Sequence, residues 1–119
     1  MSVKLFDSEL KVMEVLWKQG EQSAGQLAKT LKASIGWNRN TTYTVIKKCI
    51  EKGAIERTEP NFICSPLLTR NEIQQAEANE LMDKMFDGSA EQFFVAMLGD
   101  KKLDQREIEN LKRIVNELE

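Results

Sequence analysis

The sequence contains no histidine and only two cysteines and two prolines among its 119 residues. Without histidine the chain has no imidazole general base, no Ser–His or Cys–His pair and no histidine ligand for a metal. Two prolines and six glycines are too few for a disordered composition. The composition therefore predicts an ordered protein that is not an enzyme and that carries no metal or other cofactor.

Long hydrophobic runs are also missing. No stretch approaches the roughly 20 apolar residues that a membrane helix requires, so no membrane partner is expected. The first residues, MSVKLFDSELKVM, include charges and lack the apolar segment of a secretory signal. Low cysteine usage fits a reducing compartment. We therefore expect a cytoplasmic protein.

The charge is distributed unevenly along the chain. The net charge is −2, but residues 1–70 hold 11 Lys and Arg against 7 Asp and Glu, whereas residues 71–119 hold 6 against 12. Residues 29–57 are the most basic part, with seven basic and two acidic side chains. This asymmetry indicates a polyanionic partner for the first half only.

Three helices are predicted at the start of the chain, because apolar residues recur there at helical spacing. They cover residues 8–18, 23–31 and 38–52. Asp7, Ser23 and Asn38 precede them and have side chains that commonly accept hydrogen bonds from the first helical turn. We therefore place these three residues at the N-caps.

A β-hairpin is predicted after the third helix. The segments AIERT and FICSP are short runs rich in β-branched or aromatic residues, separated by Glu59, Pro60 and Asn61. An isolated hairpin is marginal in water, so it is expected to lie against the helices as a wing. Residues 1–68 are thus predicted to form a winged helix-turn-helix domain, and the fold class is mainly α with a small β-hairpin wing.

The remaining residues, 69–119, are predicted to form three amphipathic helices capped by Thr69, Ser89 and Asp104. So small a helical unit rarely folds alone, and pairing with a second copy would bury its apolar stripes. We expect a homodimer, with a C-terminal helical dimerisation region. The predicted dimerisation residues are Leu81, Met85, Phe93, Phe94, Met97, Ile108, Leu111, Val115 and Leu118. The alternative is that a cluster of Met and Phe residues lines a pocket for an apolar effector; the cluster consists of Met82, Met85, Phe86, Phe93, Phe94 and Met97.

The third helix opens with a polar run, Asn38 to Thr44, composed mostly of poor helix formers. Short hydrogen-bonding side chains and arginine are what a helix in the DNA major groove uses to read base edges, and cations hold the phosphates. The residues predicted to contact operator DNA are Arg39, Asn40, Thr41, Tyr43 and Thr44, with Lys47, Lys48 and Arg57 on phosphate.

Two alternatives stay open at this point. The first is a winged-helix protein-interaction module that does not bind DNA; such a surface should expose apolar residues, and only Tyr43 qualifies on the third helix. The second concerns Cys49 and Cys64, which are predicted to be small core residues but could form a redox switch if they approach within disulfide range.

Several segments together resemble the penicillinase repressor family of winged-helix regulators. They are EVLWKQGEQSAGQLAKTL, GWNRNTTYTVIKKCIEKGAIER and CSPLLTRNEIQQAEANELMDKMFDGS. The family includes the bacterial repressors of β-lactamase and methicillin-resistance genes and a copper-responsive branch. The resemblance implies a homodimer that represses transcription by binding a palindromic operator. It also implies that the third helix enters the major groove and that the C-terminal helices dimerise.

The chain departs from the family pattern in two ways. Antibiotic-responsive members are cut at an Asn–Phe bond in their dimerisation helices, whereas Ala96 and Met97 occupy that position here. The Asn61–Phe62 pair lies in the predicted wing turn and is interpreted as turn chemistry. The cysteine-rich C-terminal motif of the copper branch is absent, which argues against copper sensing. The sequence therefore identifies no effector and no inducing protease.

Overall fold

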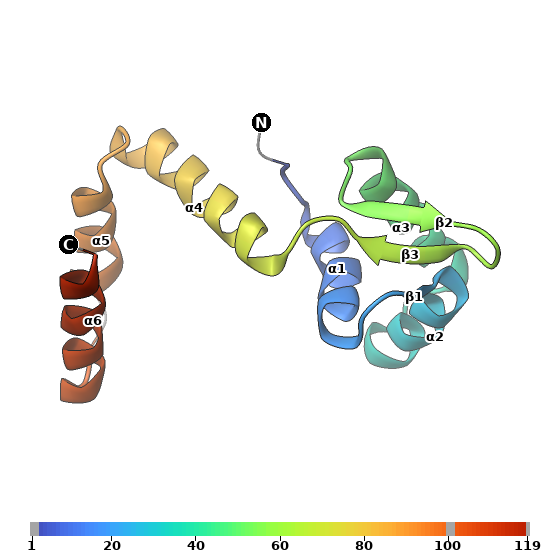
Figure 1. Ribbon diagram of the computed structural model, residues 1–119, viewed down its shortest axis with the longest axis horizontal. Coiled ribbons are helices and arrows are strands. Elements are labelled where there is room, and N and C mark those ends of the chain that lie inside the picture. Colours follow the sequence, from blue (N-terminus) through green and yellow to red (C-terminus); the bar gives the residue numbers. More distant parts are fainter. Residues whose placement is uncertain (1–2, 100–101, 119) are drawn as a thin grey trace. The chain divides into compact units, whose positions relative to one another are not determined.

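The computed structural model describes residues 3–99 and 102–118. Its elements are α1 (Asp7–Gln19), β1 (Gln22–Ser23), α2 (Ala24–Ile35), α3 (Arg39–Glu51), β2 (Ile55–Thr58), β3 (Ile63–Pro66), α4 (Arg70–Phe86), α5 (Ala90–Gly99) and α6 (Gln105–Glu117) (Figure 1). The chain forms two compact units, one ending at Ala78 and one beginning at Asn79. The boundary lies within α4, because Ile73 in its first turn is buried in the core of the N-terminal unit.

The N-terminal unit combines three helices with a small antiparallel sheet, which confirms the predicted winged-helix class. The strand order is β1-β3-β2, with β3 in contact with α1 and β2 in contact with α3 (Figure 1). The predicted hairpin is present, and Arg57 pairs with Cys64 in it. The strand β1 was not predicted, since two residues are too short to show an alternating pattern.

Helix capping follows the sequence at most positions. The side chain of Ser23 accepts a hydrogen bond from the Gln26 amide at 3.1 Å, and Asn38 accepts one from the Thr41 amide at 2.8 Å. The prediction for Asp7 was wrong by one residue. Phe6 is the N-cap of α1, because its backbone is extended and its amide donates to the Glu9 carboxylate at 2.8 Å.

The core of this unit comes from all three helices and the sheet. Its buried hydrophobic residues are Leu5, Val12, Met13, Leu16, Ala24, Leu27, Leu31, Val45, Ile46, Cys49, Ala54, Ile55, Cys64 and Ile73. Within the described part of the chain, no helix is long and apolar enough to cross a membrane.

A buried ion pair joins α1 to the end of α3. The ammonium group of Lys52 lies 2.6 Å from the carboxylate of Glu9, whose side chain is only 1% exposed. Lys52 also donates to the Lys4 carbonyl at 2.8 Å and lies 3.9 Å from the centre of the Phe6 ring. These contacts fix the C-terminal end of α3 relative to α1.

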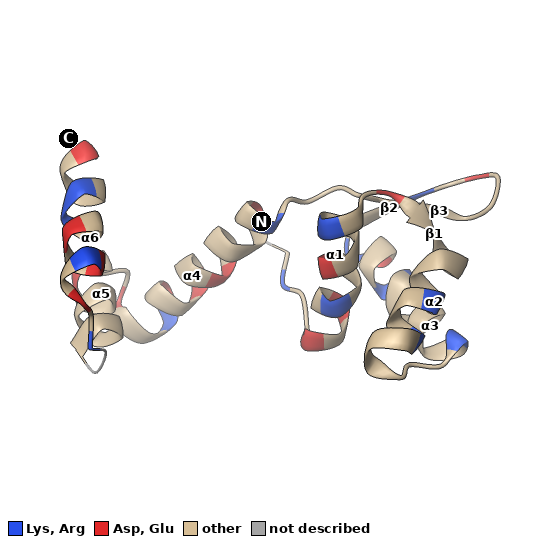
Figure 2. Ribbon diagram, turned by 90° about the horizontal axis from the view of Figure 1, so that it is seen from below, with Lys and Arg blue, Asp and Glu red and all other residues tan. Residues whose placement is uncertain are grey.

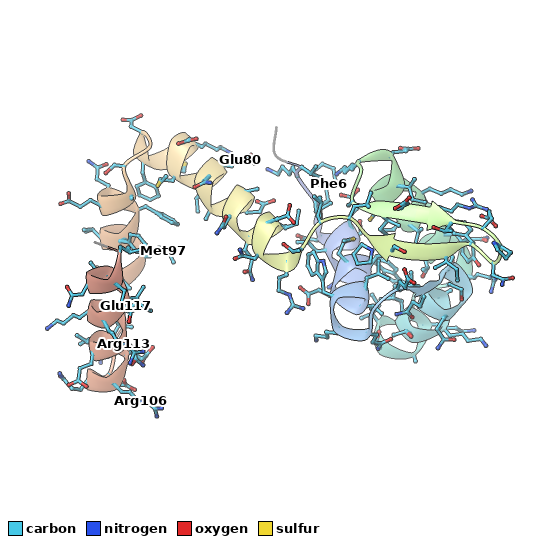
Figure 3. All side chains as sticks on the ribbon, in the orientation of Figure 1. Phe6, Glu80, Met97, Arg106, Arg113 and Glu117 are labelled. Atoms are coloured by element: carbon cyan, nitrogen blue, oxygen red, sulfur yellow. The ribbon has the colours of Figure 1, made fainter. Side chains whose placement is uncertain are left out.

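The C-terminal unit contains the second half of α4 with α5 and α6. Ser89 and Asp104 cap their helices as predicted, accepting from the amides of Gln92 and Glu107 at 3.1 and 2.8 Å. On α6 the charged residues Arg106, Arg113 and Glu117 share one side of the helix (Figure 3), and helical spacing places Ile108, Leu111 and Val115 on the opposite side.

Candidate nucleic-acid interface

The helix α3 follows α2 after a short turn in which Gly36 has a φ of 75°, a conformation that glycine adopts without strain. One face of α3 is buried in the core, through Thr42, Val45, Ile46 and Cys49. The opposite face is open to solvent. Its exposed residues are Arg39, Asn40, Thr41, Thr44, Lys47 and Lys48, and Tyr43 is half-buried at one edge.

Helical spacing sorts these exposed residues into a row and two edges. Asn40, Thr44 and Lys47 are separated by four and three residues, so they share the middle of the open face. Glu51 continues the same row at the far end of the helix and is also exposed. The open face is therefore polar and cationic over its first turns and acidic only at its end.

At one edge, Arg39 and Tyr43 contact each other. The Arg39 guanidinium donates a hydrogen bond to the Tyr43 hydroxyl at 2.9 Å and lies 4.9 Å from the centre of its ring. The hydroxyl oxygen lies 3.8 Å from the position that a Cβ would take at Gly25, so this edge adjoins the first turn of α2.

The wing residue Arg57 is not on α3, but two aromatic rings connect it to that helix. Its guanidinium lies 3.6 Å from the centre of the Phe62 ring, and Phe62 meets Tyr43 edge to face at 5.7 Å between ring centres. Arg57 is also paired with the Glu59 carboxylate. The hydrogen bond from Arg57, assisted by the Phe62 amide, holds the pKa of Glu59 below its usual range.

Phe62 was missed as a member of the site. The sequence interpretation treated Asn61–Phe62 as turn chemistry, and both residues do have positive φ values, 76° and 50°. An available signal was that Phe62 is the one aromatic residue between Gly53 and Leu68. Its contact with Tyr43 links residues 19 positions apart, which local patterns do not reveal.

The two cysteines are buried, as predicted for core residues. Burial raises the pKa of Cys49 to about 12 and that of Cys64 to about 11. Both thiols therefore stay protonated at neutral pH and lack the thiolate character of reactive cysteines. Among the described residues no group of three or more acidic or cysteine side chains could hold a metal ion.

The charge pattern of the sequence is visible on the helices. Figure 2 shows Lys and Arg on α2 and α3, where Lys29, Lys32, Lys47 and Lys48 lie, and mostly Asp and Glu on α4. What distinguishes α2 and α3 is their lack of acidic residues, because Glu51 is the one Asp or Glu on these two helices.

The residues predicted to dimerise all lie in the C-terminal unit, and most are open to solvent. The exposed ones are Leu81, Met85, Phe94, Met97, Val115 and Leu118. Phe93, Ile108 and Leu111 are half-buried. Leu98, Leu103, Ile108, Leu111 and Val115 line an apolar groove of about 400 Å³ beside α6. Within a single copy of this unit, these apolar side chains are not fully covered by other residues that the structure describes.

Comparisons with known proteins agree with this geometry. Residues 5–117 match the family model described as penicillinase repressor. The chain is 23% identical over 116 residues to the penicillinase repressor of Bacillus licheniformis, covering 96% of this chain and 91% of that protein. It is 24% identical over 115 residues to the methicillin resistance regulatory protein MecI of Mammaliicoccus sciuri, covering 95% and 94%.

Two solution structures resemble the N-terminal part. The DNA-binding domain of the repressor BlaI has a TM-score of 0.55 at 26% identity, covering 60% of this chain and 93% of that chain. The monomeric form of Bacillus licheniformis BlaI in complex with the blaP half-operator has a TM-score of 0.51 at 27% identity, covering 58% and 87%.

Proposed function

The chain belongs to the penicillinase repressor family, whose members are transcriptional repressors and not enzymes, and we propose that it acts as a homodimer that binds a palindromic DNA operator through residues 38–52. The observation that carries this proposal is the open face of α3, which presents amide, hydroxyl and cationic groups over a buried apolar face. The similar BlaI domain is bound to half-operator DNA, which supports the same use of this domain here.

The position of each side chain on α3 suggests its role. Arg39, Asn40 and Thr44 carry the groups that pair with guanine, adenine and thymine edges, and they lie on the first turns, which reach base edges when a recognition helix enters the major groove. Tyr43 lies beside Arg39 at one edge of this face, and Thr41 lies at the other edge. Lys47 and Lys48 follow one turn later and would contact phosphate.

Arg57 would supply a phosphate contact from the wing. In the structure its guanidinium is shared between the Phe62 ring and the Glu59 carboxylate. A phosphate contact therefore requires Arg57 to exchange Glu59 for a phosphate oxygen, an exchange between two anionic partners at an exposed site.

Dimerisation through the C-terminal unit completes the proposal. Most of the predicted dimerisation residues are large hydrophobic side chains exposed to solvent, a feature that marks interaction surfaces when such residues are contiguous. A two-fold dimer would bury that surface and present two copies of α3 to two half-sites of one operator. A protein-docking role for the winged helix has less support, because the open face of α3 carries no exposed large hydrophobic residue.

Salt-dependent binding assays on single variants test the DNA-reading role. Arg39→Ala should lower the affinity for the selected operator by about 1–3 kcal/mol and relax the sequence preference, because a guanidinium reads base edges. Lys48→Ala should weaken binding to all DNA sequences alike. It should also reduce the slope of log affinity against log salt concentration by about one, because a phosphate contact is lost.

The matched control is Lys18→Ala, which removes an exposed cation from α1 instead of from α3 or the wing. It should leave both affinity and slope unchanged. If Arg39→Ala lost the same affinity for every sequence, the reading role of Arg39 would be contradicted. If the wild-type protein selected no duplex, the proposed function would be contradicted.

A further inference from the structure

A chain of four side chains runs from the recognition helix to the wing. Arg39 donates a hydrogen bond to the Tyr43 hydroxyl, and the Tyr43 ring meets the Phe62 ring edge to face. The Arg57 guanidinium lies over the Phe62 ring. Aromatic pairs in this geometry are stabilising beyond the area that they bury. The position of Arg39 is thus coupled to a residue that lies 23 positions later in the chain.

The backbone of Phe62 is held in a conformation that bulky residues avoid. Its φ is 50°, in the left-handed region. Its carbonyl accepts a hydrogen bond from the Ala24 amide at 2.9 Å, which places the β2–β3 turn beside the start of α2 (Figure 1). Strained residues of this kind persist only where their surroundings hold them and are frequent at functional sites.

We propose that Phe62 is a positioning residue for sequence reading: through Tyr43 its ring holds the Arg39 guanidinium at the first turn of α3 in the orientation used on DNA. This inference rests on the proposed function, because it assigns Phe62 a role within the same DNA interface. Arginine recognises guanine through a planar fork of two hydrogen bonds, so its orientation decides how well it discriminates. A side chain ordered before binding also loses less conformational entropy on binding.

The salt dependence of DNA binding distinguishes a positioning role of Phe62 from a phosphate contact. Phe62 is uncharged, so its substitution removes no phosphate contact and should leave the salt slope unchanged. The loss should instead appear in the preference for one base pair. Sequence preference is therefore the readout that a merely structural role would not change.

The experiment begins with duplexes selected from random DNA by the wild-type protein. The base pair at which Arg39→Ala loses discrimination identifies the one that Arg39 reads. Fluorescence anisotropy then compares Phe62→Leu on the selected duplex and on the duplex changed at that base pair. We expect the preference for the selected duplex to fall about three- to tenfold, with an unchanged salt slope. The double variant Arg39→Ala, Phe62→Leu should be no less selective than Arg39→Ala.

Three further variants separate positioning from folding. Phe62→Tyr keeps the ring and should restore the preference. Tyr43→Phe keeps the edge-to-face ring contact but removes the hydroxyl that accepts the 2.9 Å hydrogen bond from Arg39. It should therefore lose sequence preference at the same base pair, even if Phe62→Leu folds poorly. Leu10→Ala truncates another half-buried side chain packed on the same core and should leave the preference intact.

The outcomes are distinct. If the wild-type protein selects no sequence, the proposed function fails. The positioning role is overturned, while DNA binding stands, by any of three results with a protein that selects an operator. In the first, Arg39→Ala leaves the preference at every base pair unchanged; in the second, Phe62→Leu keeps the wild-type preference; in the third, Phe62→Leu weakens binding to all duplexes equally.

Discussion

Two threonines of α3, Thr42 and Thr44, are two positions apart and have opposite environments. Thr44 is exposed on the open face, whereas Thr42 is fully buried. The Thr42 hydroxyl has no hydrogen-bond partner among the residues that the structure describes. A buried hydroxyl without a partner destabilises the folded state, so the two threonines should respond differently to the same substitution.

We expect Thr42→Val to raise the free energy of unfolding by about 1 kcal/mol, because valine keeps the shape and removes the unpaired hydroxyl. DNA affinity should not change, since the side chain faces the core. Urea denaturation and DNA titration measure the two effects. The matched control is Thr44→Val, which should leave stability within about 0.5 kcal/mol and weaken operator binding. A destabilised Thr42→Val would show that the hydroxyl has a partner in solution.

At the scale of elements, the open face of α3 is useful only if the helix is held rigidly on its opposite side. The Glu9–Lys52 pair does this at the C-terminal end of α3. Burial acts to raise the pKa of Glu9, but the hydrogen bonds from Lys52 and from the Phe6 amide outweigh it and hold this pKa below its ordinary value of 4.5. The folded state therefore favours the ionised carboxylate.

The pH dependence of stability follows from that direction. A lowered pKa in the folded state contributes stability that is present above the ordinary value of 4.5 and is lost as the pH falls through the folded-state pKa. Glu9→Gln should reduce the free energy of unfolding at neutral pH by about 1.5–3 kcal/mol, because it removes a charge-assisted hydrogen bond.

Denaturation series at neutral and acidic pH measure this effect. The difference between wild type and Glu9→Gln should shrink as the pH is lowered from the ordinary value of 4.5 through the lower folded-state pKa. The control is Glu14→Gln, which alters a carboxylate on the same helix whose partner, Arg70, is exposed. A difference that stays constant with pH would mean that folding does not shift the pKa of Glu9.

At the scale of the whole molecule, the proposed dimer concerns the C-terminal unit. Val115 is 62% exposed and contributes to the apolar groove beside α6. If a second copy covers this surface, a charge placed there must be buried without a partner on association.

We expect the wild-type protein to sediment as a dimer at micromolar concentration and Val115→Glu to sediment as a monomer that binds a half-site with its wild-type salt slope per subunit. Analytical ultracentrifugation measures the change. The matched control is Arg113→Glu, which places the same residue on the charged side of the same helix (Figure 3) and should remain dimeric. A wild-type monomer at this concentration would count against the palindromic operator.

The helices, most of their caps, the hairpin and the open face of α3 could all be predicted from local sequence patterns. These features depend on interactions between residues three or four positions apart, or on adjacent turn residues, so local patterns carry them. Ser23, Asn38 and Asp104 are helix caps as predicted, and Cys49 is buried on the inner face of α3 as predicted.

The contacts between residues far apart in the chain could not be predicted and follow from the packing of the fold. The strand β1, the ion pair between Glu9 and Lys52, and the contact between Tyr43 and Phe62 each join segments separated by 19 to 43 positions. Such contacts depend on how the helices and the sheet pack, and no local period encodes them. The physical reason is that a helix or turn is specified by neighbours in the chain, whereas the position of Arg39 depends on a wing that folds back from beyond the end of its own helix.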